Sequence, residues 1–195
     1  IYTLTLHDAL PDLPLSPVVA GLARQEMQRL AVYRCLGRIG GDTAAADLLL
    51  EGVQSGLPSV RAAAICSLVS VMQNLEPLFH QATLERVRFL ADQGLLENLL
   101  AAYDGSNLSL AEAVVTLLGM IADPRGVPLL IQAITDERLA HKAFTALTSI
   151  GNAALVPAVE RFSQADELER AAICTLINHL GQTAAGVEQV VLRAL

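Results

Sequence analysis

The feature that most constrains this chain is an apolar pattern that recurs about every 30 residues. In its clearest copies, residues 136–151 and 168–181, an amphipathic segment ends in an apolar residue followed by glycine. When the copies are aligned on that last position, apolar residues also stand one, four and eight places before it, which puts them on one face of a helix. The aligned positions are Gly40, Met72, Ala122, Gly151 and Gly181, at intervals of 32, 50, 29 and 30 residues. Such a recurrence predicts a helical solenoid, because a single hairpin cannot bury its apolar face alone.

The alignment also predicts the core and the ends of these helices. Leu118 stands four places before Ala122, so we expect it to be buried between neighbouring hairpins. A terminal glycine is typical of a helix whose last turn closes in a left-handed conformation.

Residues 123–136, together with the helix that ends at Gly151, resemble the bacterial HEAT-like repeat named after phycobilisome lyases. That repeat has a short helix of the form Val-Pro-x-Leu-x-x-x-Leu, an Asp near the turn, and then Val-Arg-x-x-Ala-x-x-x-Leu-x-x-Ile-Gly. Its arginine position is held here by Arg29, Arg61 and Arg170, and by Ala111 and Ala140 in the other two copies. The resemblance covers about residues 16–195. It implies a fold and says little about function, because this repeat serves many unrelated proteins.

We therefore predict an all-α fold, a right-handed α-α superhelix of the HEAT or armadillo type. It should contain about five helical hairpins and a terminal half repeat within residues 16–195. Residues 18–23 and 24–39 are expected to form the first outer and inner helices. Residues 1–15 are proline-rich near their end and predict an extended connector, and the first residue is not methionine, so we expect a fragment of a larger bacterial protein. The last segment, 185–195, is predicted to be an outer helix without a partner, prone to fraying or self-association.

The regular spacing fails between Met72 and Leu108, where there are about 20 residues more than a repeat needs. Apolar residues in 77–91 predict one inserted helix there. Insertions of this size lie at an edge of a solenoid, where they serve as docking elements or as spacers that change its curvature. The sequence leaves both explanations open.

Composition limits the other possibilities. Of 195 residues, 53% are hydrophobic and only 4% aromatic, which suits closely stacked helices. No unbroken apolar run is long enough to span a membrane. Cys35, Cys66 and Cys174 all fall in the repeated helices, so we expect them to be small buried thiols in a reducing cytoplasm.

No pattern of catalytic or metal-ligating residues appears. His7, His80, His141 and His179 include no pair three or four residues apart and none stands beside a cysteine, so zinc-ligand spacing is absent. The His-Glu pairs that bind iron in HEAT-repeat hydroxylases are missing, as are a glycine-rich phosphate loop and a Gly-x-Ser-x-Gly motif. We predict no catalytic, cofactor or metal site. A net charge of −7 with few, scattered aromatic residues also argues against the DNA binding of HEAT-like glycosylases.

Charge is distributed unevenly over the repeated helices. The positions two and six places before each aligned residue should face the concave side, and none of them is acidic. The last eleven residues before the aligned positions hold Arg29, Arg34, Arg38, Arg61, Lys142 and Arg170 against Glu112 alone. The predicted partner-binding residues are Arg34, Arg38, Ser70, Thr116, Met120, Lys142, Thr145, Ser149, Thr175 and His179. This favours a groove for an extended or helical, mildly acidic protein segment. Acidic residues gathering at helix starts for dipole reasons would explain the same distribution.

The function expected from these observations is a non-enzymatic, cytoplasmic protein-binding scaffold without nucleic acid, membrane insertion or cofactor. A bilin lyase-like enzyme subunit is the alternative that the family name implies. Such a lyase would need a His or Tyr converging with a carboxylate, and the predicted concave positions lack that set. Charge reversal at Arg161, expected on an outer helix, should have little effect.

Overall fold

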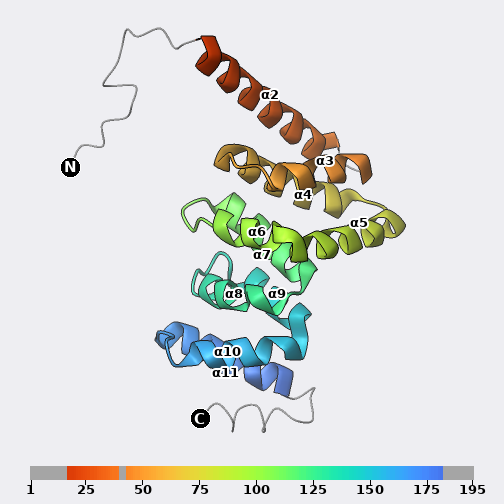
Figure 1. The fold of residues 1–195 in the computed structure, drawn as a ribbon. Coiled ribbons are helices and arrows are strands. Elements are labelled where there is room, and N and C mark those ends of the chain that lie inside the picture. Colours follow the sequence, from red (N-terminus) through yellow and green to blue (C-terminus); the bar gives the residue numbers. More distant parts are fainter. Residues whose placement is uncertain (1–16, 40–42, 182–195) are drawn as a thin grey trace, which may run out of the picture.

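The computed structural model describes residues 17–39 and 43–181, and this part of the chain is an all-helical repeat solenoid. Figure 1 shows the helices in successive layers, from α2 at one end to α11 at the other. The helices are α2 (Pro17–Ile39), α3 (Thr43–Val53), α4 (Pro58–Asn74), α5 (Pro77–Leu90), α6 (Leu96–Ala102), α7 (Leu108–Ile121), α8 (Val127–Ile134), α9 (Ala140–Ile150), α10 (Leu155–Phe162) and α11 (Glu167–Gly181). The predicted all-α solenoid is thus confirmed.

The inner helices α2, α4, α7, α9 and α11 form one row in which each contacts the next. The outer helices α3, α6, α8 and α10 pack against α4, α7, α9 and α11 respectively. Close approach within the inner row depends on small residues. A Cβ atom added to Gly119 would lie 2.9 Å from the Cβ of Ala146, and one added to Gly37 would lie 2.8 Å from the Cβ of Ser67. These glycines therefore let α7 approach α9 and α2 approach α4.

The predicted core stripe is buried where a helix has neighbours on both sides. In α7, Val114 and Leu118 are no more than 1% exposed, as the alignment predicts. The first copy differs, because Val32 and Ile39 are 51% and 80% exposed although they hold equivalent positions. Among the described helices, α2 packs mainly on α4 and leaves these side chains uncovered. Burial of the stripe therefore depends on neighbouring layers as well as on sequence.

Gly151 after α9 has a positive φ of 67°, but its ψ of −143° lies outside the left-handed helical region. The predicted left-handed closure occurs at the end of α7, where Ala122 has a φ of 57° and a ψ of 38°. Ala122 adopts this conformation without being glycine. Met72 does not end its helix, because α4 continues to Asn74.

The expected division at residues 23–24 is wrong, because α2 runs as one helix from Pro17 to Ile39. Residues 22–26 are Leu-Ala-Arg-Gln-Glu, without a proline or a helix-capping residue, so nothing in the sequence stops the helix there. The expected connector at 1–15 and the half repeat at 185–195 lie outside the described residues. Within the described part, no helix has the length and apolar character needed to cross a membrane.

Candidate functional site

The inserted helix α5 forms one wall of a groove along the inner row. Figure 1 shows α5 projecting to one side of the stack. The groove has a volume of about 550 Å³ and lies between α5, α7 and α9. It is lined by Leu84 and Arg88 of α5, Val115, Thr116, Gly119 and Met120 of α7, and His141, Lys142, Thr145, Ala146 and Ser149 of α9, with Gln73 of α4 and Ala122. We call this the inner groove.

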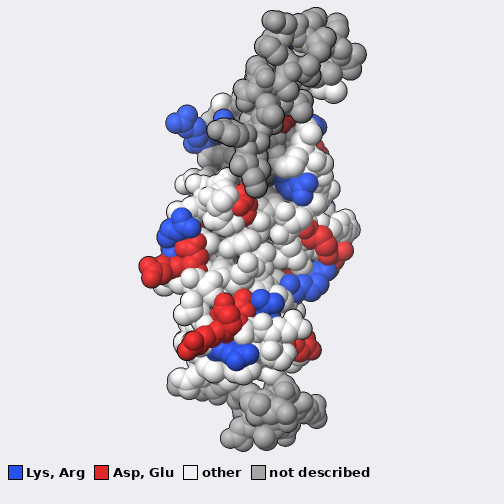
Figure 2. All heavy atoms as spheres, turned by 90° about the vertical axis from the view of Figure 1, so that its left-hand side faces the viewer, with Lys and Arg blue, Asp and Glu red and all other residues white. Residues whose placement is uncertain are grey.

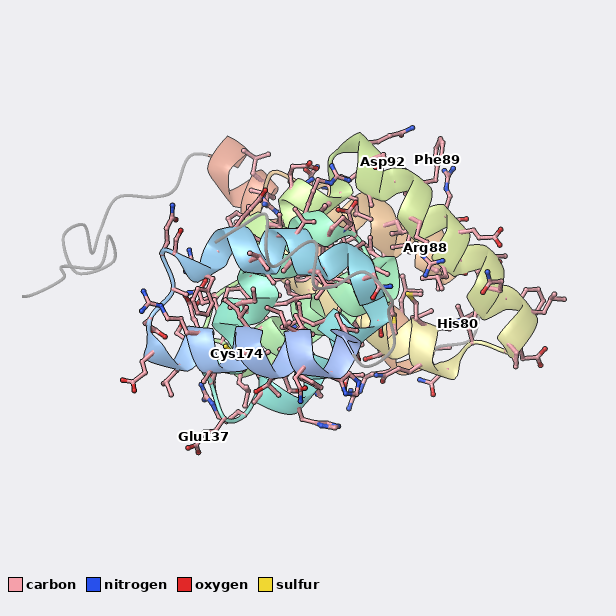
Figure 3. The ribbon with its side chains drawn as sticks, turned by 90° about the horizontal axis from the view of Figure 1, so that it is seen from below. His80, Arg88, Phe89, Asp92, Glu137 and Cys174 are labelled. Atoms are coloured by element: carbon pink, nitrogen blue, oxygen red, sulfur yellow. The ribbon has the colours of Figure 1, made fainter. Side chains whose placement is uncertain are left out.

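Hydrogen bonds and a buried side chain hold α5 in this place. Arg88 donates from Nε and Nη2 to the carbonyl oxygen of Met120 at 3.3 and 3.1 Å, which satisfies a carbonyl at the end of α7. Val87 beside it is fully buried. Figure 3 shows Arg88 pointing from α5 toward the stack and Phe89 pointing away from it. One face of α5 thus belongs to the groove and the other faces outward.

The turn after α5 is fixed by an ion-pair cluster. Residues 91–95 join α5 to α6 across a kink, where Gln93 and Gly94 leave the helical conformation and Gly94 takes a φ of 98°. Arg125 lies in the short turn before α8 and bonds Asp92 at 3.0 Å, Glu97 at 3.4 Å and Asp123 at 2.7 Å. This cluster ties the α5–α6 turn to the next repeat.

The groove carries basic groups and no acidic ones. Arg88, His141 and Lys142 line it, whereas none of the described residues lining it is Asp or Glu. Lys142 Nζ bonds Glu112 Oε2 at 2.8 Å beside the groove. Within the part of the chain that the structure describes, no ion pair forms at Arg88. Positive charge is therefore only partly compensated here.

Hydroxyl groups on the groove wall are oriented by their own helices. Thr116 donates to the carbonyl of Glu112 at 2.8 Å, Thr145 to that of His141 at 2.9 Å, and Ser149 to that of Thr145 at 2.9 Å. A hydroxyl has one donor and two acceptor lone pairs. Since each donor is used within its helix, these side chains can offer acceptor capacity to a ligand.

A second, smaller pocket of about 300 Å³ lies between α2 and α4. Arg34, Gly37, Arg38, Cys66, Ser67 and Ser70 line it, and again no described lining residue is acidic. We call it the α2–α4 pocket. Neither Arg34 nor Arg38 forms an ion pair with another described residue.

The ten predicted partner-binding residues are distributed over three places. The inner groove contains Thr116, Met120, Lys142, Thr145 and Ser149, and the α2–α4 pocket contains Arg34, Arg38 and Ser70. Thr175 and His179 lie on α11, where His179 stacks edge-on against Phe144 with ring centroids 5.5 Å apart. That these residues bind a partner stays a prediction. Sequence reasoning missed Arg88, because the repeat alignment omits the inserted helix.

Several charged side chains elsewhere are paired. Figure 2 shows basic and acidic side chains lying together in mixed clusters on the face that it presents. Asp136 accepts a hydrogen bond from the Nη2 of Arg138 at 2.6 Å, and this bond with its neighbours lowers the pKa of Asp136 to about 2. Asp123 accepts from Arg125 in the same way, which lowers the pKa of that carboxyl. We call these two Asp-x-Arg pairs the charged turns.

The contacts of Arg161 differ from the expectation that a charge reversal there would have little effect. It lies on the outer helix α10, but its Nη2 bonds both carboxylate oxygens of Glu169 at 2.9 and 3.1 Å, and Glu169 is buried. Breaking a pair with a buried partner leaves an uncompensated charge, so a charge reversal here should be harmful rather than neutral.

The cysteines also differ from expectation. Cys35 and Cys174 are exposed, and Cys66 is half-buried. Burial raises the pKa of the Cys66 thiol. The prediction of buried thiols is therefore wrong for Cys35 and Cys174, which lie on the uncovered sides of α2 and α11.

The residues present do not fit a metal site. Within residues 17–39 and 43–181 there is no group of three or more His, Cys, Asp or Glu side chains that could hold a metal ion.

Comparison with known proteins shows a similarity to an enzyme. No protein-family model matches the sequence. The chain is 27% identical over 132 residues to the human deoxyhypusine hydroxylase, an alignment that covers 62% of this chain and 43% of the human protein. Deoxyhypusine hydroxylase is a HEAT-repeat protein, so the match agrees loosely with a HEAT-like repeat. The chain spans less than half the length of this relative.

This similarity overturns the prediction of a purely non-enzymatic scaffold. That prediction depended on the lack of catalytic motifs in this sequence. A segment that matches 43% of an enzyme can contribute to binding without carrying the reacting groups. The lack of these motifs therefore does not make the whole protein a non-enzyme.

Proposed function

We propose that this chain is a substrate-holding part of a HEAT-like repeat enzyme, in which the inner groove binds an acidic polypeptide segment. The described residues supply binding and positioning, and the reacting groups come from elsewhere in the whole protein. The enzymatic context is supported by the similarity to a hydroxylase. The binding role is supported by a groove of about 550 Å³ built from four helices.

The observation that carries the proposal is the charge of the groove lining. The chain has a net charge of −7, yet Arg88, His141 and Lys142 line the groove and none of the described lining residues is Asp or Glu. A locally basic groove in an acidic protein attracts acidic segments, speeds their association and repels basic ones. A carboxylate of the bound segment would compete with Glu112 for Lys142.

The repeat subclass, source and compartment are parts of the same proposal. The phycobilisome-lyase type of HEAT repeat is supported by residues 123–151. A bacterial, cytoplasmic protein agrees with that repeat type and with three free thiols. We also retain the division into a connector at 1–15 and one repeat domain at 16–195.

Peptide binding tests the proposal directly. A labelled acidic peptide of about six residues, long enough for one groove, is titrated with the protein and followed by fluorescence anisotropy. A basic peptide of equal length is the comparison. We expect the acidic peptide to bind more tightly, and Arg88→Gln and Lys142→Gln each to weaken it roughly three- to tenfold, as the loss of one partly exposed charge contact implies.

Arg86→Gln is the matched control, because Arg86 is on the same helix but lies over the outward-facing Phe89 ring, 6.0 Å from its centroid. Its peptide affinity should equal that of the unaltered protein. Equal affinity of the acidic and the basic peptide would contradict the proposal.

A further inference from the structure

The two basic pockets adjoin along α4. Ser70 lines the α2–α4 pocket and Gln73 lines the inner groove. These residues are three apart on one helix, which separates them by about 4.5 Å along its axis and keeps them on the same face. The pockets are therefore two parts of one surface that crosses the inner row.

The length of this surface follows from the packing of the helices. α2, α4, α7 and α9 contact one another in that order, which makes three steps between neighbouring axes. Packed helices lie about 8–10 Å apart, so the surface extends for about 24–30 Å. An extended polypeptide advances about 3.3 Å per residue and needs about nine residues to cover that distance.

Hydroxyl groups that bond within their own helix recur on three of the four helices, α4, α7 and α9. Ser70 donates to the carbonyl of Cys66 at 3.2 Å, in the same way as Thr116, Thr145 and Ser149 donate within α7 and α9. Ser and Thr in helices often make this bond to the residue four places earlier. Here it aligns acceptor lone pairs over three successive inner helices.

Such a row of acceptors suits an extended chain better than a helix. The backbone N–H groups of an extended segment lack partners, whereas most of those in a helix are already bonded. The hydroxyl oxygens along the surface can accept hydrogen bonds from the N–H groups of an extended segment. A helical segment offers them few free N–H groups.

Basic groups stand at both ends of the surface. Arg34 and Arg38 lie one helical turn apart at one end. Like charges at this spacing destabilise an isolated helix, and a bound anion would reduce their repulsion. Arg88 and Lys142 lie at the other end. Arginine pairs particularly well with carboxylates, because its planar fork matches their geometry.

We propose that the bound partner is an extended acidic polypeptide segment of about nine residues, laid across α2, α4, α7 and α9 with carboxylates at both ends. This inference depends on the proposed function, because it adds the α2–α4 pocket to the inner groove as a second contact for the same segment. The row of hydroxyl groups between them holds the backbone of the segment.

Two labelled peptides test it by fluorescence anisotropy. The short one has about five residues and acidic side chains at one end, and the long one has about ten residues and acidic side chains at both ends. On the unaltered protein we expect the long peptide to bind at least about tenfold more tightly, because its second contact is intramolecular. The double variant Arg34→Gln/Arg38→Gln should remove that advantage and leave the short peptide unchanged. Arg24→Gln on the same helix, outside the α2–α4 pocket, is the control and should change neither.

The conformation of the segment is tested with a third peptide. A side-chain-stapled helical version of the long peptide should bind at least about fivefold more weakly, since its N–H groups are already bonded. The variant Thr145→Val/Ser149→Ala keeps side-chain volume nearly constant and should weaken the extended peptides while leaving the stapled one unchanged.

The outcomes separate the two proposals. Equal affinities of the long and short peptides, with both preferred over a basic peptide, would overturn the extended segment and keep the proposed function. Tighter binding of the stapled peptide would overturn the extended conformation. A failure of every acidic peptide to bind would overturn both.

Discussion

The α2–α4 pocket and the charged turns use the same kinds of side chain in opposite ways. At the charged turns each arginine has a carboxylate two residues before it, as in Asp123–Arg125 and Asp136–Arg138. On the inner surface, Arg34 and Arg38 have no ion-pair partner among the described residues. The difference separates charges that fix the fold from charges that remain available to a ligand.

The comparison also shows how arginines that stabilise the fold differ from arginines that are free to bind a ligand. In an Asp-x-Arg pair the two charged side chains bond each other within three residues, so the pair stabilises a turn in any copy of the repeat. An arginine without a nearby carboxylate gains little for the fold, because exposed charges contribute little to stability. Unpaired basic residues beside a pocket are therefore the better candidates for binding.

The largest expected effect is on stability, and it distinguishes residues on the buried face of α7 from residues on its groove face. Leu118 is 1% exposed, whereas Met120 on the same helix lines the inner groove. Leu118→Ala should lower the free energy of unfolding by about 2–5 kcal/mol through loss of buried contacts and a residual cavity. Met120→Ala should cost about 1 kcal/mol or less. Urea denaturation measures both, and a loss below about 1 kcal/mol for Leu118→Ala would show that the core face is misassigned.

A smaller effect on stability distinguishes paired from unpaired arginines. Arg161→Ala should lower the urea midpoint clearly, because it leaves the buried carboxylate of Glu169 without its ion-pair partner. Arg34→Ala removes an arginine with no ion pair among the described residues, and should leave the midpoint nearly unchanged. Equal shifts in the two variants would contradict the distinction between fold-fixing and ligand-binding charges.

The smallest effect concerns the charged turns and depends on pH. The pKa of Asp136 is lowered to about 2, below the unfolded value of about 3.9. Its ionised form therefore stabilises the folded protein at pH above about 4, and this contribution is lost as the pH falls from 4 toward 2. The difference in thermal midpoint between the unaltered protein and Asp136→Asn should accordingly be present at pH 6 and shrink below pH 4. A difference that does not vary with pH would mean that the Arg138 pair does not control this carboxyl.

The sequence predicted the regular part of the fold well, for a physical reason. Apolar residues at fixed helical spacing have to face a common core, so the spacing alone is enough to place Val114 and Leu118 in it. The exposure of Ile39 could not be predicted, because it depends on which layer covers α2.

The candidate site was predictable only in part. Seven of its predicted residues follow from the repeat register, two or six places before an aligned position, and line the two pockets. Lys142, the eighth, was predicted from its charge instead. The wall formed by α5 depends on the left-handed Gly94 and on the bond from Arg88 to Met120, and neither is encoded in a period of 30 residues. Arg161 and Glu169 lie eight residues apart on different helices, so their pairing also required the packing of α10 on α11.

Photo-cross-linking tests most directly whether the inner groove binds an acidic polypeptide. An acidic peptide of about ten residues with a central photoreactive side chain is irradiated with the protein, and the labelled residues are identified by mass spectrometry. We predict saturable labelling on α7 and α9, around Met120 and Thr145, which an excess of unlabelled acidic peptide abolishes. Saturable labelling at the charged turns, around Arg125 or Arg138, with none in the groove, would contradict the account.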